Sequence, residues 1–471
     1  MNKLNKNLLG RREFFGRSIR GGVATALALQ TRSSRAAARP SLLEVGEGVV
    51  GSTPPLGIEL AGFHRPADNR RLITGIRQPT AARALVLRHH DVQAAVVSLD
   101  ICAVSREFVG RVQRRVAKQT GIPSEAVHVC ATHTHSMPTF RFFRQWGAVP
   151  RQYTAQVELS VVQAIERARD DLAPAELYVG KSGSHGANFN RTARTWKTDK
   201  EFTADSTDDD RWLDTKVHVM RFERAGKKRN LLWYHFSAHP VCYTDGNAGS
   251  DWPGLVAKLV LEKQKTSPVF LQGHCGDVNP GSGKPWLGEP DKVAAEVSAA
   301  IGRALDDAVA VPIKDIRHVT AQCELSLDLE RFKSQLEQYR TNPSTCTKGE
   351  WVDAGFAADW FKSANRWDLN RRTLTAPISA LRLGDVGMLF HPAELYSYYG
   401  LALGRDSPLE HTLVVGYSDA FVGYLPDPNA YKAGEYAAIT VPRICDLPPF
   451  KPETAREFTA AASRLLEKVA S

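Results

Sequence analysis

The chain has 471 residues, of which 43% are hydrophobic and 24% are charged, and these values are typical of globular proteins. The composition excludes a disordered, collagen-like or coiled-coil chain, and the length allows one large domain or about three smaller ones. The net charge of +10 is concentrated at the N-terminus. Residues 1–38 contain eight of the basic residues and one acidic residue, so the other 433 residues carry only +3. That remaining charge gives no basis for a nucleic-acid partner. No run of apolar residues is long enough to predict a membrane-spanning helix.

The N-terminal residues 1–38 have the order of parts found in an export signal. Arg11 and Arg12 are followed by a polar residue and two phenylalanines, then by a short apolar stretch at 21–29 and small residues at 36–38. This order predicts a twin-arginine signal peptide, and therefore a periplasmic or secreted protein that uses the twin-arginine export machinery. That route carries folded proteins, which suits an enzyme that acquires its metal before export. The alternative is a basic N-terminus with a chance arginine pair.

Strands and helices alternate along the rest of the chain. The β-rich segments 84–89 and 94–99 flank a turn at 90–91, and a helix is predicted over 106–119 with Ser105 as its N-cap. Further strands are predicted at 127–132, 176–182, 217–223, 229–237, 268–271, 318–327, 377–383 and 386–391, and further helices at 151–171, 253–264, 291–309 and 454–469.

The alternation of elements predicts an α/β fold, with one large mixed α/β domain over residues 39–471. Residues 193–211 are polar and are predicted to form a long surface loop. After Val311 the pattern becomes more β-like. The seven cysteines contain no CxxC pair, which argues against a thiolate zinc site.

Unusual polar residues lie directly after several predicted strands. His133 and His135 follow one strand, and His239, His274 and Glu394 follow three others. Because ligands bind beyond the strand ends of α/β sheets, these loops are predicted to converge on one site. Two imidazoles and a carboxylate form a standard set for catalytic zinc. Residues two apart in an extended segment face the same side, so one of the paired histidines would bind metal while the other handles protons. Taken singly, each such residue is more often a hydrogen-bonding or core residue.

Several motifs in these loops occur together in a known family. They are EVGEGVVGSTPPLGIELAGF (44–63), AAVVSLDIC (94–102), ATHTHSMP (131–138), FNRT (189–192), SAHPV (237–241), GSDWPG (249–254), LQGHCGDVNP (271–280), HPAELY (391–396) and the pair Tyr424 and Tyr436. Together they resemble the neutral/alkaline non-lysosomal ceramidase family, specifically its N-terminal zinc-dependent catalytic domain. The most specific match is ATHTHSMP, which is similar to the family's ATHTHSGP signature.

The resemblance implies a zinc-dependent amide hydrolase with one Zn²⁺ per chain. By resemblance, zinc is assigned to His133, His239, Glu394 and Tyr424, and the catalytic groups that act on the substrate are His135, Arg191 and Tyr436. The alternative for Tyr424 is a packed aromatic residue with a hydrogen-bonded hydroxyl. Residues expected to support the ligands or to contact the substrate are Asp100, Asp251, His274, Asp277 and Asn279. For the aspartates, turn capping or a buried hydrogen bond is the alternative.

The sequence also departs from the family's pattern. Met137 and Asn279 stand where the ceramidases have glycine and serine, and the chain is expected to lack the family's C-terminal immunoglobulin-like domain. The expected function is therefore an exported zinc hydrolase that cleaves an N-acyl amide bond. Alternatives are a hydrolase of a non-lipid amide or ester, such as a sugar or cell-wall derivative, and a non-catalytic binding protein on the same fold. The expected partner is a lipid or another small molecule, and peripheral contact with a membrane stays open.

Overall fold

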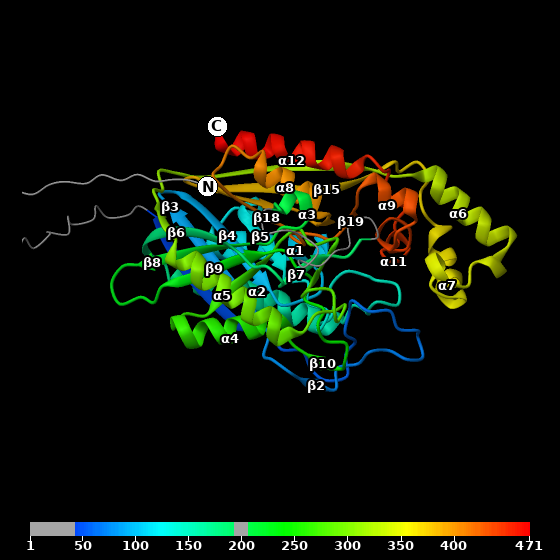
Figure 1. The fold of residues 1–471 in the computed structure, drawn as a ribbon, viewed down its shortest axis with the longest axis horizontal. Helices are drawn as coiled ribbons and strands as arrows, with labels where there is room; N and C mark the ends of the chain where they lie inside the picture. Colours follow the sequence, from blue (N-terminus) through cyan, green and yellow to red (C-terminus); the bar gives the residue numbers. More distant parts are fainter. Residues whose placement is uncertain (1–42, 193–205) are drawn as a thin grey trace, which may run out of the picture. The chain divides into compact units, whose positions relative to one another are not determined.

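Two β-sheets lie between two sets of helices in the structure, a computed structural model (Figure 1). The structure describes residues 43–192 and 206–471. The signal peptide predicted over 1–38 and most of the surface loop predicted over 193–211 lie outside these residues. Direct contacts join the facing sheets: His235 Nε2 on the larger sheet donates to the carbonyl of Val414 on the smaller one, at 3.0 Å. The mixed α/β fold expected from the sequence is confirmed.

The larger sheet carries most of the core. Its strands follow the order β11-β9-β8-β6-β1-β3-β4-β5, with β13 paired to β6. The strands are β1 (Leu43–Gly51), β3 (Ala81–His89), β4 (Val92–Leu99), β5 (Val127–Ala131), β6 (Ala173–Gly183), β8 (Lys216–Arg224), β9 (Leu231–Phe236), β11 (Pro268–Gln272) and β13 (Val309–Val311). The β4–β5 and β9–β11 pairs are parallel, and the other pairs along this order are antiparallel.

The two ends of the larger sheet approach each other. The Ser98 hydroxyl on β4 donates to the carbonyl of Phe270 on β11 at 2.6 Å, although these strands are far apart in the strand order. Neighbouring strands rotate by about 20–25°, so the steps from β5 to β11 add up to nearly half a turn. The sheet must therefore curl as well as twist, and the carboxyl ends of β5 and β11 lie close together.

The smaller sheet contains β14 (Ile316–Ser326), β15 (Thr373–Leu383), β16 (Val386–Phe390) and β18 (His411–Val415), in that order. Three short ladders complete the strand pairing: β2 (Gly75–Ile76) with β10 (Asn247–Ala248), β7 (Asn188–Asn190) with β12 (Val278–Pro280), and β17 (Ala393–Leu395) with β19 (Gly423–Leu425). The β17–β19 ladder is parallel and follows directly after β16. It brings residues from the C-terminal part of the chain to the ends of the larger sheet's strands.

Helices cover the outer face of each sheet. Helices α1 (Arg106–Thr120), α2 (Arg151–Asp170), α4 (Trp252–Gln264) and α5 (Pro290–Asp306) pack on the larger sheet, and α8 (Ser397–Arg405) and α12 (Thr454–Ala470) on the smaller one (Figure 1). The remaining helices are α3 (Asp208–Arg211), α6 (Leu329–Thr341), α7 (Ala354–Ala364), α9 (Pro428–Ala433), α10 (Tyr436–Ile439) and α11 (Val441–Ile444). As predicted, Ser105 caps α1 by accepting from the Phe108 N–H, and Phe108 and Val112 lie on its buried face.

The strands and helices predicted before Val311 are confirmed with small shifts at their ends. The expectation of a more β-like pattern after Val311 is incomplete, because α6 to α11 also lie there. Helix α6 starts at the N-cap Asp328 and buries Phe332 and Leu336, which are four residues apart, against the tryptophans of a small aromatic cluster. The end of the predicted 193–211 loop is helical, at α3. Among the described helices, none has the length and hydropathy needed to cross a membrane.

We expect Gly48→Ala to destabilise the fold, because β1 lies in direct contact with the backbone of α2. A Cβ atom at Gly48 would lie 2.0 Å from the carbonyl oxygen of Ala164. Such overpacking should lower the free energy of unfolding by about 2 kcal/mol. Gly51→Ala on the same strand is the control, because no atom lies within 4 Å of its Cβ position. Equal midpoints for the two variants in chemical denaturation would contradict this packing.

Candidate metal centre

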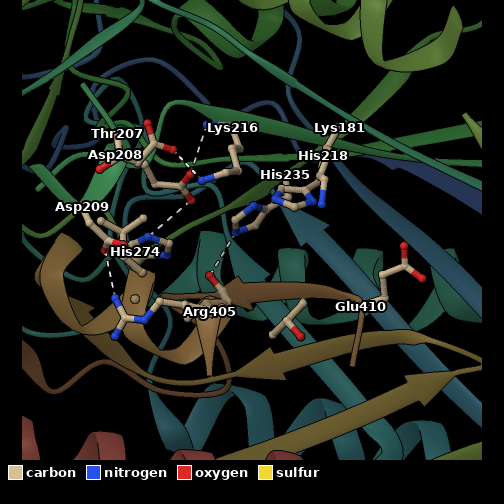
Figure 2. A pocket seen from close by; sticks show the side chains of 16 residues that line it. Lys181, Thr207, Asp208, Asp209, Lys216, His218, His235, His274, Arg405 and Glu410 are labelled. Carbon is tan, nitrogen blue, oxygen red and sulfur yellow. Dashed lines mark hydrogen bonds and ion pairs between the residues drawn. The ribbon is translucent and has the colours of Figure 1, made fainter. Parts of the chain in front are cut away.

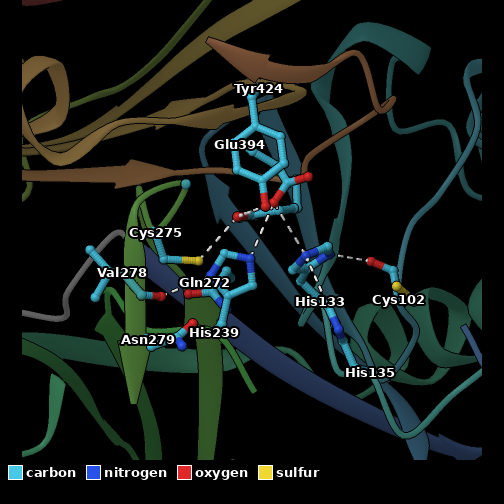
Figure 3. A network of polar contacts seen from close by, with 12 residues as sticks. Cys102, His133, His135, His239, Gln272, Cys275, Val278, Asn279, Glu394 and Tyr424 are labelled. Atoms are coloured by element: carbon cyan, nitrogen blue, oxygen red, sulfur yellow. Dashed lines mark hydrogen bonds and ion pairs between the residues drawn. The ribbon is translucent and has the colours of Figure 1, made fainter. Parts of the chain in front are cut away.

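Three of the predicted ligands meet at the ends of strands (Figure 3). His133 follows β5, His239 follows β9, and Glu394 lies on β17. Their ligand atoms all lie within 4.8 Å of one another, and all three residues are buried. His239 Nε2 lies 3.2 Å and His133 Nε2 3.5 Å from Glu394 Oε2. These side chains form a compact group with the chemistry of a divalent metal site.

Backbone carbonyls orient both imidazoles. His133 Nδ1 donates to the carbonyl of Cys102 at 2.7 Å, and His239 Nδ1 donates to the carbonyl of Val278 at 2.8 Å. A carbonyl oxygen only accepts, so Nδ1 carries the hydrogen in each ring and Nε2 is turned toward Glu394. This is the arrangement in which metal-binding histidines are usually held.

The charges at this group favour a cation. Burial alone would raise the pKa of Glu394, but His133 and His239 hold that pKa well below its usual range. Burial alone would lower the pKa of His133, but the Glu394 carboxylate raises that pKa to about 10. Burial lowers the pKa of His239 to about 4, so this ring stays neutral. A proton on His133 thus balances the buried carboxylate, and a divalent cation would balance the same charge while using both Nε2 lone pairs.

The hydroxyl of Tyr424 lies at the edge of the group. Tyr424 on β19 is in register with Glu394 on β17. Arg191 Nη2 donates to the Tyr424 hydroxyl at 2.7 Å and to the carbonyl of Gly276 at 2.9 Å, and Arg191 Nη1 donates to Asn279 Oδ1 at 2.9 Å. Asn279 therefore fixes the guanidinium beside Tyr424. Burial raises the pKa of Tyr424 well above its ordinary value.

His135 lies against the first histidine, with the two Nε2 atoms 3.2 Å apart. Both rings face the site, as expected, but the segment is a turn and not a strand, because His133 has a left-handed backbone with φ of 61°. Arg71 donates to the carbonyl of His135 at 2.7 Å. Burial lowers the pKa of His135 well below its ordinary value, and the positive charges on His133 and Arg71 lower it further. The imidazole is therefore neutral.

Tyr436 begins α10 and closes one side of the site. Its side chain is 45% exposed, and its ring lies 6.4 Å from the ring of Tyr424. Two hollows meet at these tyrosines. The walls of the first, beside the metal ligands, are mainly apolar and include Phe143, Trp146, Phe421, Val441 and Ile444. The second has a volume of about 300 Å³, and its lining includes Arg191, Trp286, Tyr396 and Glu435.

The other supporting residues act through the backbone or through neighbouring side chains. Asp277 accepts from Asn190 Nδ2 and from the backbone and hydroxyl of Ser397, so its carboxylate braces the residue before Arg191. Asp251 caps α4 and accepts from backbone N–H groups, including that of Trp252. The Trp252 indole in turn donates to the carbonyl of His239 at 3.1 Å.

Asp100 and His274 lie away from the metal group. Asp100 pairs with Arg83 at 2.7 Å and accepts from a backbone N–H at the start of β3. The loop after β11 joins the three other strand-end loops through Gly276 and Asn279, as predicted, but the His274 side chain does not face the metal group. Its ring packs against α8, where a Cβ atom at Gly400 would lie 2.0 Å from it, and faces a separate cavity of about 320 Å³ (Figure 2). Asp214 is its polar neighbour there, at 3.4 Å.

Two residues that sequence analysis did not select contact the ligand loops. The Tyr417 ring stacks on His133 with a centroid separation of 4.2 Å, and its hydroxyl donates to Glu394 Oε2 at 3.3 Å. Gln272, the last residue of β11, bonds to the residues that precede His133 and His239. The sequence alone could have indicated Gln272, because this polar residue ends an otherwise apolar strand. Tyr417 follows β18 after a glycine, a pattern too common to select it.

The fold and the site together define a mixed α/β protein with a buried His–His–Glu centre suited to metal-assisted hydrolysis. Residues 44–291, just over half of the chain, match the family model described as neutral/alkaline non-lysosomal ceramidase, N-terminal. The chain therefore belongs to this family of amidohydrolases and is a ceramidase-type hydrolase.

Individual ceramidases are similar to this chain over most of its length. The neutral ceramidase of Mycobacterium tuberculosis (strain ATCC 25618 / H37Rv) is 22% identical over 84% of this chain and 73% of its own length. The crystal structure of neutral ceramidase from Pseudomonas aeruginosa matches with a TM-score of 0.69 at 17% identity, over 91% of this chain and 75% of that one. A structure described as ceramidase complexed with C2 matches with a TM-score of 0.67 at 17% identity, covering 91% and 74% of the two chains. At these identities the solved structures establish the shared fold.

We expect Gly62→Ala to disable the site through His135. A Cβ atom at Gly62 would lie 2.2 Å from Cγ of His135, so the imidazole would have to move. Turnover should fall by about 100-fold, the usual value of a positioned acid–base group. Gly57→Ala is the matched control, because Gly57 has a similar backbone (φ of 86° against 93°) but no atom within 4 Å of its Cβ position. Equal turnover of the two variants in steady-state kinetics would contradict the expectation.

Proposed function

We propose that this protein is an exported, zinc-dependent hydrolase of the neutral ceramidase type, which cleaves the amide bond of an N-acyl lipid. The observation that carries the proposal is the buried group of His133, His239 and Glu394 with the proton-accepting His135 directly beside it. The family and the fold support an amidohydrolase, and the group of ligands supports a metal cofactor.

His133, His239 and Glu394 would hold the zinc ion, and Tyr424 is the fourth proposed ligand. Two neutral imidazole nitrogens and a carboxylate are a standard set of protein ligands for catalytic zinc. When bound there, zinc polarises a carbonyl and lowers the pKa of a water molecule toward neutrality. Zinc also fits better than a hard cation such as Mg²⁺, which prefers oxygen ligands.

Side chains of the protein accept and donate the protons in this reaction. His135 accepts the proton of the attacking water at a ring nitrogen, which its lowered pKa leaves unprotonated. Arg191 and Tyr436 donate hydrogen bonds to the carbonyl oxygen of the substrate as negative charge develops on it. His135 or Tyr436 then passes a proton to the leaving amine, and the products are a carboxylate and an amine. Asn279 and Gly276 hold the guanidinium in place for this role.

The apolar walls beside the metal ligands support a lipid substrate. Phe143, Phe421 and Ile444 line the small hollow that reaches His133 and His135, and they offer apolar contacts to the part of an acyl chain next to the amide. The neighbouring hollow, with Arg191 and Glu435, is more polar and suits the hydroxyl-bearing amine part. A short amide of a sugar or cell-wall derivative would leave the apolar walls uncovered.

We further propose export by the twin-arginine route. The proposal rests on the sequence of residues 1–38, with Arg11 and Arg12 before the apolar stretch. A metal centre built from three distant parts of the chain is complete only after folding. Loading zinc before export therefore requires a route that accepts folded proteins.

Purified mature protein should contain about one zinc per chain, since one open catalytic site is proposed. His133→Ala and His239→Ala should each lose the metal. His135→Ala and Tyr436→Phe should keep it but lose about 100-fold or more in turnover, because they act on protons and on the oxyanion. The measurement is elemental analysis beside steady-state kinetics on N-acyl sphingosines, short amides and esters.

Each result of this experiment tests a different part of the proposal. Full zinc content in both ligand variants would show that the ligand assignment is wrong. Loss of zinc from the His135 variant would make it a ligand and not a base. Faster turnover of short amides or esters than of N-acyl sphingosines would reject the lipid substrate in favour of a non-lipid one, and no turnover of any of them would favour a binding protein.

Arg11→Lys together with Arg12→Lys should keep the precursor in the cytoplasm, because the twin-arginine machinery recognises that pair. The measurement is fractionation of cells that express the full chain, with immunodetection of the precursor and mature forms. Lys3→Arg together with Lys6→Arg is the control, since it also exchanges basic residues in this region but leaves the pair intact. Normal periplasmic accumulation of the Arg11 and Arg12 variant would reject this route.

A further inference from the structure

Gln272 lies where the two histidine-bearing loops meet. It is the last residue of β11, and it is 1% exposed. Its side-chain Nε2 donates to the carbonyl of Thr132 at 3.1 Å and to the carbonyl of Ala238 at 3.0 Å. Thr132 directly precedes His133 and Ala238 directly precedes His239. One amide group therefore joins the backbones of both loops, one residue before each proposed ligand.

The hydrogen-bonding groups of the Gln272 amide are fully used. Both N–H groups go to carbonyls, and Oε1 accepts from the N–H of Gly273 at 3.0 Å. Exchanging the oxygen and nitrogen would place an acceptor against two acceptors, so these partners settle the orientation of the amide. A glutamine so constrained holds its partners at a set separation.

A third loop is tied to the same residue through the backbone. The carbonyl of Gln272 accepts from the N–H of Gly416 at 3.0 Å. Gly416 precedes Tyr417, whose ring stacks on His133 and whose hydroxyl donates to Glu394. Gln272 thus connects the loops of both histidines with the residue that braces the carboxylate.

The need for this side chain follows from the strand pairing. The ladder between β4 and β5 ends at the pair Leu99 and Ala131, and the ladder between β9 and β11 ends at Phe236 and Gln272. Thr132 and Ala238 lie beyond these last pairs, where no ladder supplies donors to their carbonyls. A buried carbonyl without a donor is costly, and the glutamine amide supplies both donors.

We propose that Gln272 is a positioning residue that sets the separation of the two histidine ligands and so tunes metal affinity. This inference rests on the proposed zinc centre. The amide of Gln272 acts through the two carbonyls that precede the ligands, to which its nitrogen donates. Partners of this kind around metal ligands change metal affinity or activity by about 10–100-fold.

The test compares Gln272→Met with Ser98→Ala. Methionine has a similar length and volume but no donor, so it removes both bonds with little change in packing. Ser98 is equally buried at 1% exposure, and its hydroxyl also joins the ends of the larger sheet, through Phe270, without contacting a ligand loop. The control therefore removes a buried hydrogen bond between the same sheet ends but leaves the ligand loops intact.

The zinc Kd is measured by competition with a chelator, and amide hydrogen exchange at His133 and His239 is measured in the zinc-free protein. Gln272→Met should weaken zinc binding by about 10-fold or more and speed exchange at both histidines. Excess zinc should restore kcat substantially, with KM unchanged. Ser98→Ala should leave the Kd within about twofold, the level of a distant substitution. An unchanged Kd in Gln272→Met, or an equal loss in both variants, would overturn the proposal.

Two further results keep the test decisive. If Gln272→Met fails to fold, Gln272→Asn is used, which keeps the donors on a side chain too short to reach both carbonyls; it should also weaken zinc binding, and wild-type affinity would overturn the proposal. If the wild-type protein binds no zinc, the proposed function fails. The exchange rates at His133 and His239 then decide separately whether Gln272 positions these loops, and equal rates in wild type and variant would reject it.

Discussion

The buried carboxylate of Glu394 is the constraint on which the rest of the site depends. A carboxylate out of contact with water requires positive charge and hydrogen-bond donors close by. His133 supplies both and the Tyr417 hydroxyl adds a further donor, while neutral His239 turns the lone pair of its Nε2 toward the same carboxylate oxygen. A backbone carbonyl accepts a hydrogen bond from Nδ1 of each imidazole, so the Nε2 atoms face the carboxylate. A divalent cation is the species that best satisfies this set of atoms, which is why a zinc hydrolase is the function that we propose.

The fold brings these groups together from parts of the chain that are distant in sequence. The larger sheet curls so that the ends of β5 and β11 lie together, and the parallel β17–β19 ladder adds Glu394 and Tyr424 from the C-terminal part. The two histidine ligands lie just beyond regular pairing, where the backbone can turn but carbonyls lack partners, whereas Glu394 and Tyr424 are paired with each other in their ladder. Gln272 satisfies two of those carbonyls. The precision of the site thus depends on side chains that do not touch the metal position.

Much of this arrangement could be predicted from the sequence, but only where the signal is local. Apolar periodicity located the main strands and helices before Val311, and the strand-end position of His133, His239 and Glu394 indicated a common site. His274 has the same local signal, yet it lies in another cavity, because the packing of α8 determines which way its ring turns. The role of Gln272 depends on which strand ends meet after the sheet curls, and no local pattern in one sequence contains that information.

The most direct test of the central claim is the position of the metal, measured by anomalous diffraction at the zinc edge from crystals of the protein. Our account predicts one strong peak about 2.0–2.2 Å from His133 Nε2, His239 Nε2 and a carboxylate oxygen of Glu394. A peak between Cys102 and His135, or in the cavity beside His274, with none at the His–His–Glu group, would contradict it.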